Sequence, residues 1–148
     1  MNVSEIHAGF TTFVGFFGGI IATLLGGWDA GLITLTIFMI VDYVTGLIVA
    51  GVFKNSQKTE TGALESKAGW KGLCRKGTTM LIVLVACRLD ITMGLNLIRD
   101  AVVIGFIANE TISIIENMGL MGVWIPPILV KAIDILKSKS ENIDKEVE

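Results

Sequence analysis

The chain has few of the residues that build most active sites and metal sites. Its 148 residues include two cysteines and one histidine. Cys74 lies in a polar stretch and Cys87 in an apolar run, a pattern that does not favour a disulfide. His7 has no ligand residues beside it, and the cysteines lack the spacing of a zinc site. No nucleophile, base and orienting group occur together, so we expect no enzyme, no metal and no cofactor.

An excess of charge of one sign is also lacking. The net charge is −2, and no basic blocks alternate with aromatic residues, so nucleic acid is not an expected partner. The first ten residues, MNVSEIHAGF, have neither the basic region nor the small-residue cleavage site of a signal peptide. We therefore expect the first apolar run to remain in the mature protein.

Apolar residues, in contrast, are abundant. They make up 52% of the chain, and the mean hydropathy is +0.70. A soluble chain of this length cannot bury so much apolar surface. The composition therefore predicts an integral membrane protein whose main partner is the lipid bilayer.

Two long apolar runs occupy the first third of the chain. Residues 8–27 carry no charge, and residues 30–53 carry one ionisable side chain, Asp42, near their middle. A helix needs about 20 such residues to cross ~30 Å of hydrocarbon. The glycines at 26 and 27 end the first run, and Asp29 can cap the next helix. We predict a tight hairpin of two membrane spans.

Two further apolar runs, 77–95 and 101–118, contain ionisable residues. The second of them could instead lie re-entrant or in the interface, so three spans remain an alternative to four. After Pro126 and Pro127, apolar residues around Lys131, Asp134 and Lys137 predict a C-terminal amphipathic helix. We thus predict an all-α membrane bundle in a single domain, residues 1–137, followed by a charged and disordered tail, 138–148.

Residues 54–76 form the long polar connection between the second and third runs. They hold six basic and two acidic residues, a net charge of +4; the basic ones are Lys54, Lys58, Lys67, Lys71, Arg75 and Lys76. Short loops rich in lysine and arginine stay in the cytoplasm. With four spans, this loop predicts that both termini are cytoplasmic.

Ionisable and polar residues of the apolar runs are predicted to lie at one depth. Counting from the basic loop brings these residues to a similar level: Asp42, Thr45, Arg88, Asp90, Asn109 and Glu110. A lone charge there is costly, so we predict an ion pair between Asp42 and Arg88. Two interpretations remain open. The pair could be structural and fix the helix register, or the layer could hold the helix bundle closed in the monomer and face water after assembly.

Small residues predict close helix contacts in two places. Gly15 and Gly19 form a G-x-x-x-G pair in the first run. Gly46 and Ala50 lie on the same helical face as Asp42 in the second run. Small residues on one stripe let a second helix approach closely.

Several motifs, in order, carry a family resemblance. They are Asp42-Tyr43-Val44-Thr45-Gly46, the segment Ser66-Lys67-Ala68-Gly69-Trp70-Lys71-Gly72-Leu73-Cys74-Arg75-Lys76, the segment Asn109-Glu110-Thr111-Ile112-Ser113-Ile114-Ile115-Glu116-Asn117, and Gly122-Val123-Trp124-Ile125-Pro126-Pro127. Between residues 30 and 137 the chain resembles the toxin-secretion and phage-lysis holins of Gram-positive bacteria and their phages.

The resemblance implies a protein of the bacterial cytoplasmic membrane that forms homo-oligomers and opens lesions at a set time. An endolysin, or in some relatives a toxin, then crosses the membrane. The family has no catalytic residues to carry over. The alternatives are a small four-helix transporter or ion channel, which usually keeps a carboxylate in its first span, and a non-conducting membrane scaffold. Residues 8–27 have no such carboxylate.

Overall fold

The computed structural model describes residues 3–132 and 134–135, and every regular element in this part of the chain is helical. The elements are α1 (Val3–Leu24), α2 (Ala30–Ile48) with a π-helical turn η1 (Val49–Phe53), α3 (Ser66–Met93) and α4 (Ile98–Leu120). The predicted all-α class is confirmed.

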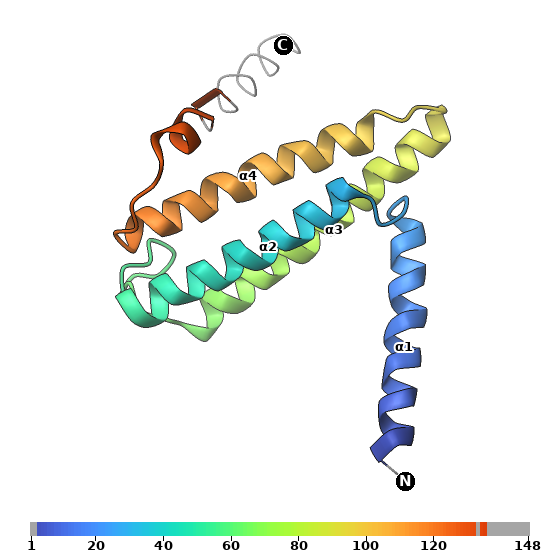
Figure 1. Cartoon of the computed structure of the whole chain (residues 1–148), viewed down its shortest axis with the longest axis horizontal. Coiled ribbons are helices and arrows are strands. Elements are labelled where there is room, and N and C mark those ends of the chain that lie inside the picture. The colour runs from blue at the N-terminus through green and yellow to red at the C-terminus, as the bar shows by residue number, and fades with distance from the viewer. Residues whose placement is uncertain (1–2, 133, 136–148) are drawn as a thin grey trace.

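Helices α2, α3 and α4 lie side by side, whereas α1 points away from them (Figure 1). The chain runs down α2, back along α3 and down α4, so α2 and α4 are parallel and α3 is antiparallel to both. α4 packs against both other helices, and most closely against α2. The bundle therefore has two ends: the α2–α3 loop lies at one, and the α1–α2 and α3–α4 turns lie at the other.

Local sequence determines the ends of the helices at these turns. Gly26 and Gly27 follow the end of α1 and have φ of +86° and +99°. Residues with a Cβ rarely adopt such positive φ values, whereas glycine does so readily. Asp29 accepts a hydrogen bond from the backbone N–H of Leu32 at 2.8 Å and so caps α2. Gly94, at φ +67°, ends α3. The predicted stop at the paired glycines and the Asp29 cap are confirmed.

The predicted basic loop, 54–76, is wrong in its second half. α3 begins at Ser66, so residues 66–76 are its first three turns and the loop proper ends at Glu65. These turns are polar and contain two glycines, a composition that resembles a loop when read by hydropathy alone. Lys67, Lys71, Arg75 and Lys76 are thus fixed on a helix.

The apolar core lies between α2, α3 and α4. Leu32 and Leu35 of α2 and Val83 of α3 are fully buried, and Met39 and Val103 complete the contact. Burial of a side chain of this size is worth about 1.5–3 kcal/mol. The core occupies the half of the bundle near the α1–α2 turn, and polar side chains fill much of the other half.

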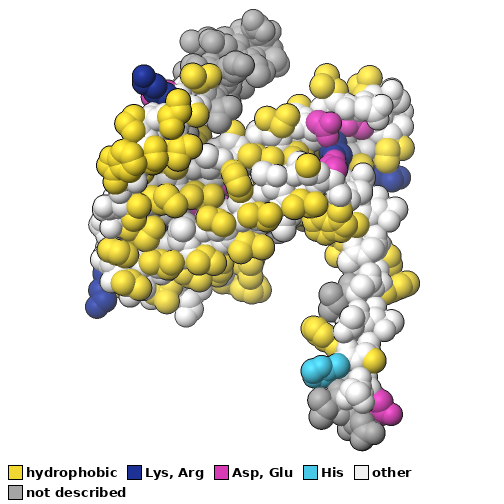
Figure 2. Space-filling model, in the orientation of Figure 1, with side chains coloured by type: hydrophobic (Ala, Val, Ile, Leu, Met, Phe, Trp, Pro, Cys, Tyr) yellow, Lys and Arg dark blue, Asp and Glu magenta, His cyan; other side chains and the backbone are white. Residues whose placement is uncertain are grey.

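The outer surface of the bundle is strongly apolar (Figure 2). Exposed residues include Ile37 and Ile40 on α2, Leu81 and Val85 on α3, and Ile104 on α4. Within the residues that the structure describes, two helical segments are long and apolar enough to cross a membrane, His7–Leu24 and Ala30–Phe53. Length and hydropathy therefore support two of the predicted spans directly.

The chain after α4 is described only in part. Residues 127–132 and 134–135 are helical, beginning at Pro127 as the double proline predicts. Lys137 and the predicted disordered tail, 138–148, lie outside the described residues.

Candidate functional site

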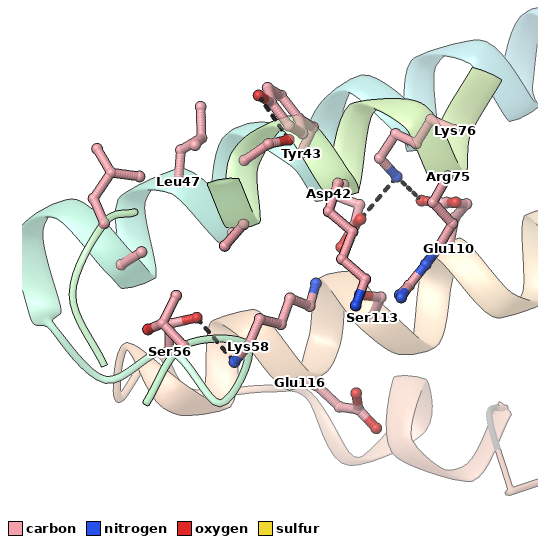
Figure 3. A pocket seen from close by; sticks show the side chains of 18 of the residues that line it. Asp42, Tyr43, Leu47, Ser56, Lys58, Arg75, Lys76, Glu110, Ser113 and Glu116 are labelled. Carbon is pink, nitrogen blue, oxygen red and sulfur yellow. Dashed lines mark hydrogen bonds and ion pairs between the residues drawn. The ribbon is translucent and has the colours of Figure 1, made fainter. Parts of the chain in front are cut away.

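A buried ion bridge joins the three packed helices. The Nζ of Lys76 on α3 lies 2.8 Å from Asp42 Oδ2 on α2 and 2.5 Å from Glu110 Oε2 on α4. All three side chains are nearly buried, with 13%, 9% and 8% of their surfaces exposed. We call these three residues the Lys76 bridge (Figure 3). One ammonium group is thus shared by two carboxylates within the bundle.

An amide extends this network on the α4 side. Asn117 Nδ2 donates to Asp42 Oδ1 at 3.0 Å and also lies 3.0 Å from Thr45 Oγ1. Thr45 in turn donates to the backbone carbonyl of Asp42. Buried polar groups must find such partners, because an unsatisfied one costs about 1–3 kcal/mol. Asn117 therefore fixes the orientation of the Asp42 carboxylate.

The predicted pair between Asp42 and Arg88 is wrong, because Lys76 occupies the place beside Asp42. Arg88 is exposed and lies about three turns further along α3, or ~18 Å away. The depth count that led to Arg88 started at Gly77, whereas α3 starts at Ser66. The same count of 11 residues from Ser66 ends at Gly77, directly after Lys76.

The other predicted members of the polar layer divide between the two ends of the bundle. Thr45 and Glu110 do lie with Asp42, as predicted from their spacing. Asn109 is exposed but lines the cavity beside them. Asp90 lies at the opposite end of α3, where it accepts hydrogen bonds from the first backbone N–H groups of α4. A single layer therefore does not form.

A second polar cluster fastens the opposite end of the bundle. Arg99 on α4 donates to Asp29 Oδ2 at 2.5 Å and to the carbonyl of Leu25 at 2.7 Å, and it also contacts Asp100. Its neighbour in space, Asp90, accepts from the N–H of Arg99 at 2.9 Å. The ends of α1, α2, α3 and α4 meet at this arginine.

The charge of Arg99 changes the acidity of its partner in the α1–α2 turn. The hydrogen bond from Arg99 is the largest influence on Asp29 and holds the pKa of that carboxyl below the ordinary 3.8. The guanidinium of an arginine stays protonated in proteins. Both groups are therefore charged throughout the physiological pH range.

A polar cavity of about 580 Å³ lies beside the Lys76 bridge, between α2, the loop after η1, α3 and α4. On α3, Gly69 and Gly72 lie against the Tyr43 side chain, where an added Cβ would be 3.6 Å and 3.7 Å from its nearest atom. Basic side chains line the cavity (Figure 3); they are Lys58, Lys71, Arg75 and Lys76. Its acidic residues are Asp42, Glu65, Glu110 and Glu116.

The predicted small-residue contacts differ between the two runs. At Gly46 a Cβ would lie 3.7 Å from Asn117 Nδ2, and Ala50 is buried, so α2 does approach α4 closely on this face. At Gly15 and Gly19 a Cβ would meet nothing within 4 Å. The G-x-x-x-G face of α1 is thus open in the single chain.

Three contacts were not predicted: those of Lys76 and Asn117 with Asp42, and those of Arg99 with the α1–α2 turn. Asn117 falls seven residues after Glu110, two turns along the same helical face, and this spacing could have found it. For Arg99 the signal was weaker, because its partners lie about 70 residues away. No group of three or more metal-binding side chains occurs in the part of the chain that the structure describes.

The all-helical fold, the apolar outer surface and the buried ion bridge are typical of a small helical membrane protein. Residues 19–138 match the model of the bacteriophage holin family. The chain is 36% identical to an uncharacterized protein of Listeria monocytogenes, with 89% of this chain and 92% of the relative covered. It is 34% identical to a probable holin of Bacillus phage phi105, over 72% of this chain and 74% of the relative. No solved structure matches it.

The chain belongs to the bacteriophage holin family. Members of this family are pore-forming membrane proteins rather than enzymes, so the prediction of a non-enzymatic protein is confirmed. Membership also implies a place in the cytoplasmic membrane.

Proposed function

We propose that the chain is a holin that assembles with copies of itself in the cytoplasmic membrane and opens lesions at a set time. An endolysin, or a toxin, would then cross the membrane without needing to bind the holin. The family match over residues 19–138 is the observation that carries this proposal. The likeness to the probable holin of a Bacillus phage supports it.

The proposed topology has four spans, α1 to α4, within one membrane domain of residues 1–137. α4 is 23 residues long, and α3 continues for 17 residues past Lys76, lengths close to those that a thin or locally thinned bilayer needs. The exposed apolar residues of all three packed helices support a lipid-facing surface. The basic α2–α3 connection would be cytoplasmic, and both termini with it.

The Lys76 bridge suggests how such a bundle stays closed before it opens. The Lys76 ammonium contacts both carboxylates while α2, α3 and α4 are packed. Separating the helices would expose three charged groups. Such groups are costly in lipid, but contact with water stabilises them. Assembly of several copies around water would therefore favour the separated state. A charge that moves through the membrane field changes energy by about 2.3 kcal/mol per 100 mV, so loss of potential can bias this step.

Inducible expression in a bacterial host tests the function. Membrane potential and culture density are followed with and without an endolysin that lacks its own export signal. A holin gives abrupt, delayed depolarisation, and lysis that depends on the endolysin. Normal growth and an intact potential, with the protein present in the membrane, would contradict the proposal and favour a transporter or a scaffold.

A further inference from the structure

Arg88 is an exposed cation on the outer face of α3. Its neighbours on that face are Leu81 and Val85, whose side chains are 60% and 57% exposed. Arg88 forms no ion pair within 4.0 Å in the described part of the chain. A charge on a helix that faces lipid is costly unless a partner reaches it. Residues 8–27 carry no charge, so α1 cannot supply this partner wherever it packs.

The outer face of α4 carries a carboxylate at nearly the same depth. Asp90 of α3 accepts a hydrogen bond from the N–H of Arg99, so these two residues lie at one level of the bundle. Arg88 lies ~3 Å further from the α3–α4 turn than this level, and Asp100 lies ~1.5 Å further. The side chain of Asp100 shares Arg99 with Asp29 and remains 61% exposed. Because two carboxylates share one guanidinium here, Asp100 can accept a second cation.

The apolar side chains beside these charges permit the two faces to approach each other. On α4, Ala101, Gly105 and Ala108 follow at i, i+4 and i+7, and a Cβ at Gly105 would meet nothing within 4 Å. On α3, the exposed side chains of Leu81 and Val85 are large. Leu81 and Ala108 each lie nine residues from the level of the Asp90 contact, because α3 and α4 are antiparallel (Figure 1). Small residues on one helix thus lie at the depth of large residues on the other, which favours close packing.

The charges also determine which faces of two copies can meet. Copies with the same topology have the same orientation in the membrane, so groups at equal depth in one chain are at equal depth in its neighbour. A contact of α3 with α3 would bring two Arg88 cations together, and a contact of α4 with α4 would bring two Asp100 carboxylates together. Only the contact of α3 with α4 places opposite charges side by side.

We propose that the outer face of α3 docks on the outer face of α4 of a second copy, with Arg88 bound to the partner's Asp100. This inference rests on the proposed self-assembly of the chain and specifies its contact surface. The contact is heterologous, because the two faces lie on different helices. Each copy therefore keeps one face free for the next copy, and the contact continues into a ring or an open array instead of ending at a dimer.

Disulfide cross-linking of the full chain in isolated membranes tests the contact. Leu81→Cys and Ala108→Cys are introduced separately and together, always with Cys74→Ala because Cys74 is exposed. We expect a ladder of dimers and larger oligomers when one chain carries both cysteines. Either cysteine alone should give at least about fivefold less product, since the same residue of two copies is then too distant for a disulfide. Equal cross-linking of a single-cysteine variant would indicate an isologous contact and overturn the proposal.

An amine-reactive cross-linker on the same membranes separates this inference from the proposed function. Oligomers with the amine reagent, but none through the two cysteines, would contradict the α3–α4 contact alone. The absence of oligomers with both reagents would contradict the proposed assembly as well as this contact.

Substitution of the two charged residues tests the ion pair. Arg88→Gln and Asp100→Asn should each reduce the disulfide ladder about threefold, the effect of a typical polar contact between membrane helices. The two changes together should reduce it no further, because they remove the same interaction. Lys67→Gln is the matched control, since Lys67 is also an exposed cation of α3. An undiminished ladder with Arg88→Gln would show that Arg88 faces lipid headgroups, and would overturn the proposed pair.

Discussion

At Lys76, one ammonium group meets two buried carboxylates, and this imbalance determines how the site responds to substitution. Removing either carboxylate leaves one ion pair with balanced charge. Removing the lysine leaves two carboxylates close together with no cation in contact. Breaking a buried pair from one side costs about 3–5 kcal/mol, because a charge is left without compensation.

We therefore predict that Lys76→Met destabilises the folded bundle by about 3–5 kcal/mol at neutral pH. The triple variant Asp42→Asn, Lys76→Met, Glu110→Gln should recover most of this loss, since it removes all three charges. Thermal unfolding in detergent measures both. Equal stability of Lys76→Met and the wild type would show that the bridge does not stabilise the folded bundle.

At Asp29, the lowered pKa makes a contribution to stability depend on pH. A carboxyl whose pKa is lower in the folded state stabilises that state fully above its unfolded value of 3.8. The contribution is lost as pH falls through the lowered value. Because the Asp29 side chain is 48% exposed, solvent screening limits the contribution to about 1 kcal/mol or less.

Asp29→Asn keeps a helix-capping side chain but removes the charge beside Arg99. We predict that this variant is slightly less stable than the wild type near neutral pH, and equally stable once the pH is well below 3.8. Thermal unfolding across the acidic range provides the comparison. A difference that stays constant down to the lowest pH would contradict the role given to Arg99.

Among the elements, α2 could be predicted almost completely and α3 could not. Residues 30–53 form an apolar run with one ionisable side chain, and Asp29 stands directly before it as a helix cap. Both signals therefore place the start of α2 at the same residue. The first turns of α3 are polar because they line a cavity and face water, so hydropathy alone does not distinguish them from a loop. The partner of Asp42 depended on that boundary, and the error moved it from Lys76 to Arg88.

The start of α4 depends on a side chain from the preceding helix. Asp90 accepts hydrogen bonds from the N–H groups of Ile98 and Arg99 at 3.0 and 2.9 Å, which the end of a helix otherwise leaves unpaired. Sequence patterns miss such a cap because Asp90 belongs to the preceding helix and lies seven residues before Leu97, the usual capping position of α4.

We predict that Asp90→Ala costs about 1–2 kcal/mol of stability, as for other helix caps. Asp100→Ala is the control, since Asp100 is exposed and contributes an ion pair to Arg99 at the surface. That change should cost less than about 1 kcal/mol. Unfolding of both variants tests the cap; the same small loss in each would contradict it.

At the scale of the whole molecule, α1 stands apart from the bundle that the other helices form (Figure 1). Its face at Gly15 and Gly19 is open, because a methyl group added at either glycine would have no neighbour within 4 Å. In a membrane, helices associate through such small residues. If copies of the chain assemble as we propose, this face is available for contact between them.

We predict that replacing Gly15 and Gly19 together with leucine leaves the fold intact and reduces cross-linked oligomers in membranes severalfold. Gly9→Leu is the control, because it also faces open space but lies outside the G-x-x-x-G pair. Cross-linking in isolated membranes measures the effect. Unchanged oligomers in the double variant would exclude this face from the assembly.

Structure and proposed function meet at the Lys76 bridge, which we propose keeps the bundle closed until the lesion opens. The most direct measurement is the time between induction and depolarisation for Lys76→Met, with Lys76→Arg and Lys67→Met as controls at matched protein levels in the membrane. We predict an earlier onset for Lys76→Met and a nearly unchanged onset for both controls. A Lys76→Met protein that depolarises the membrane at the wild-type time, or later, would contradict this role of the bridge.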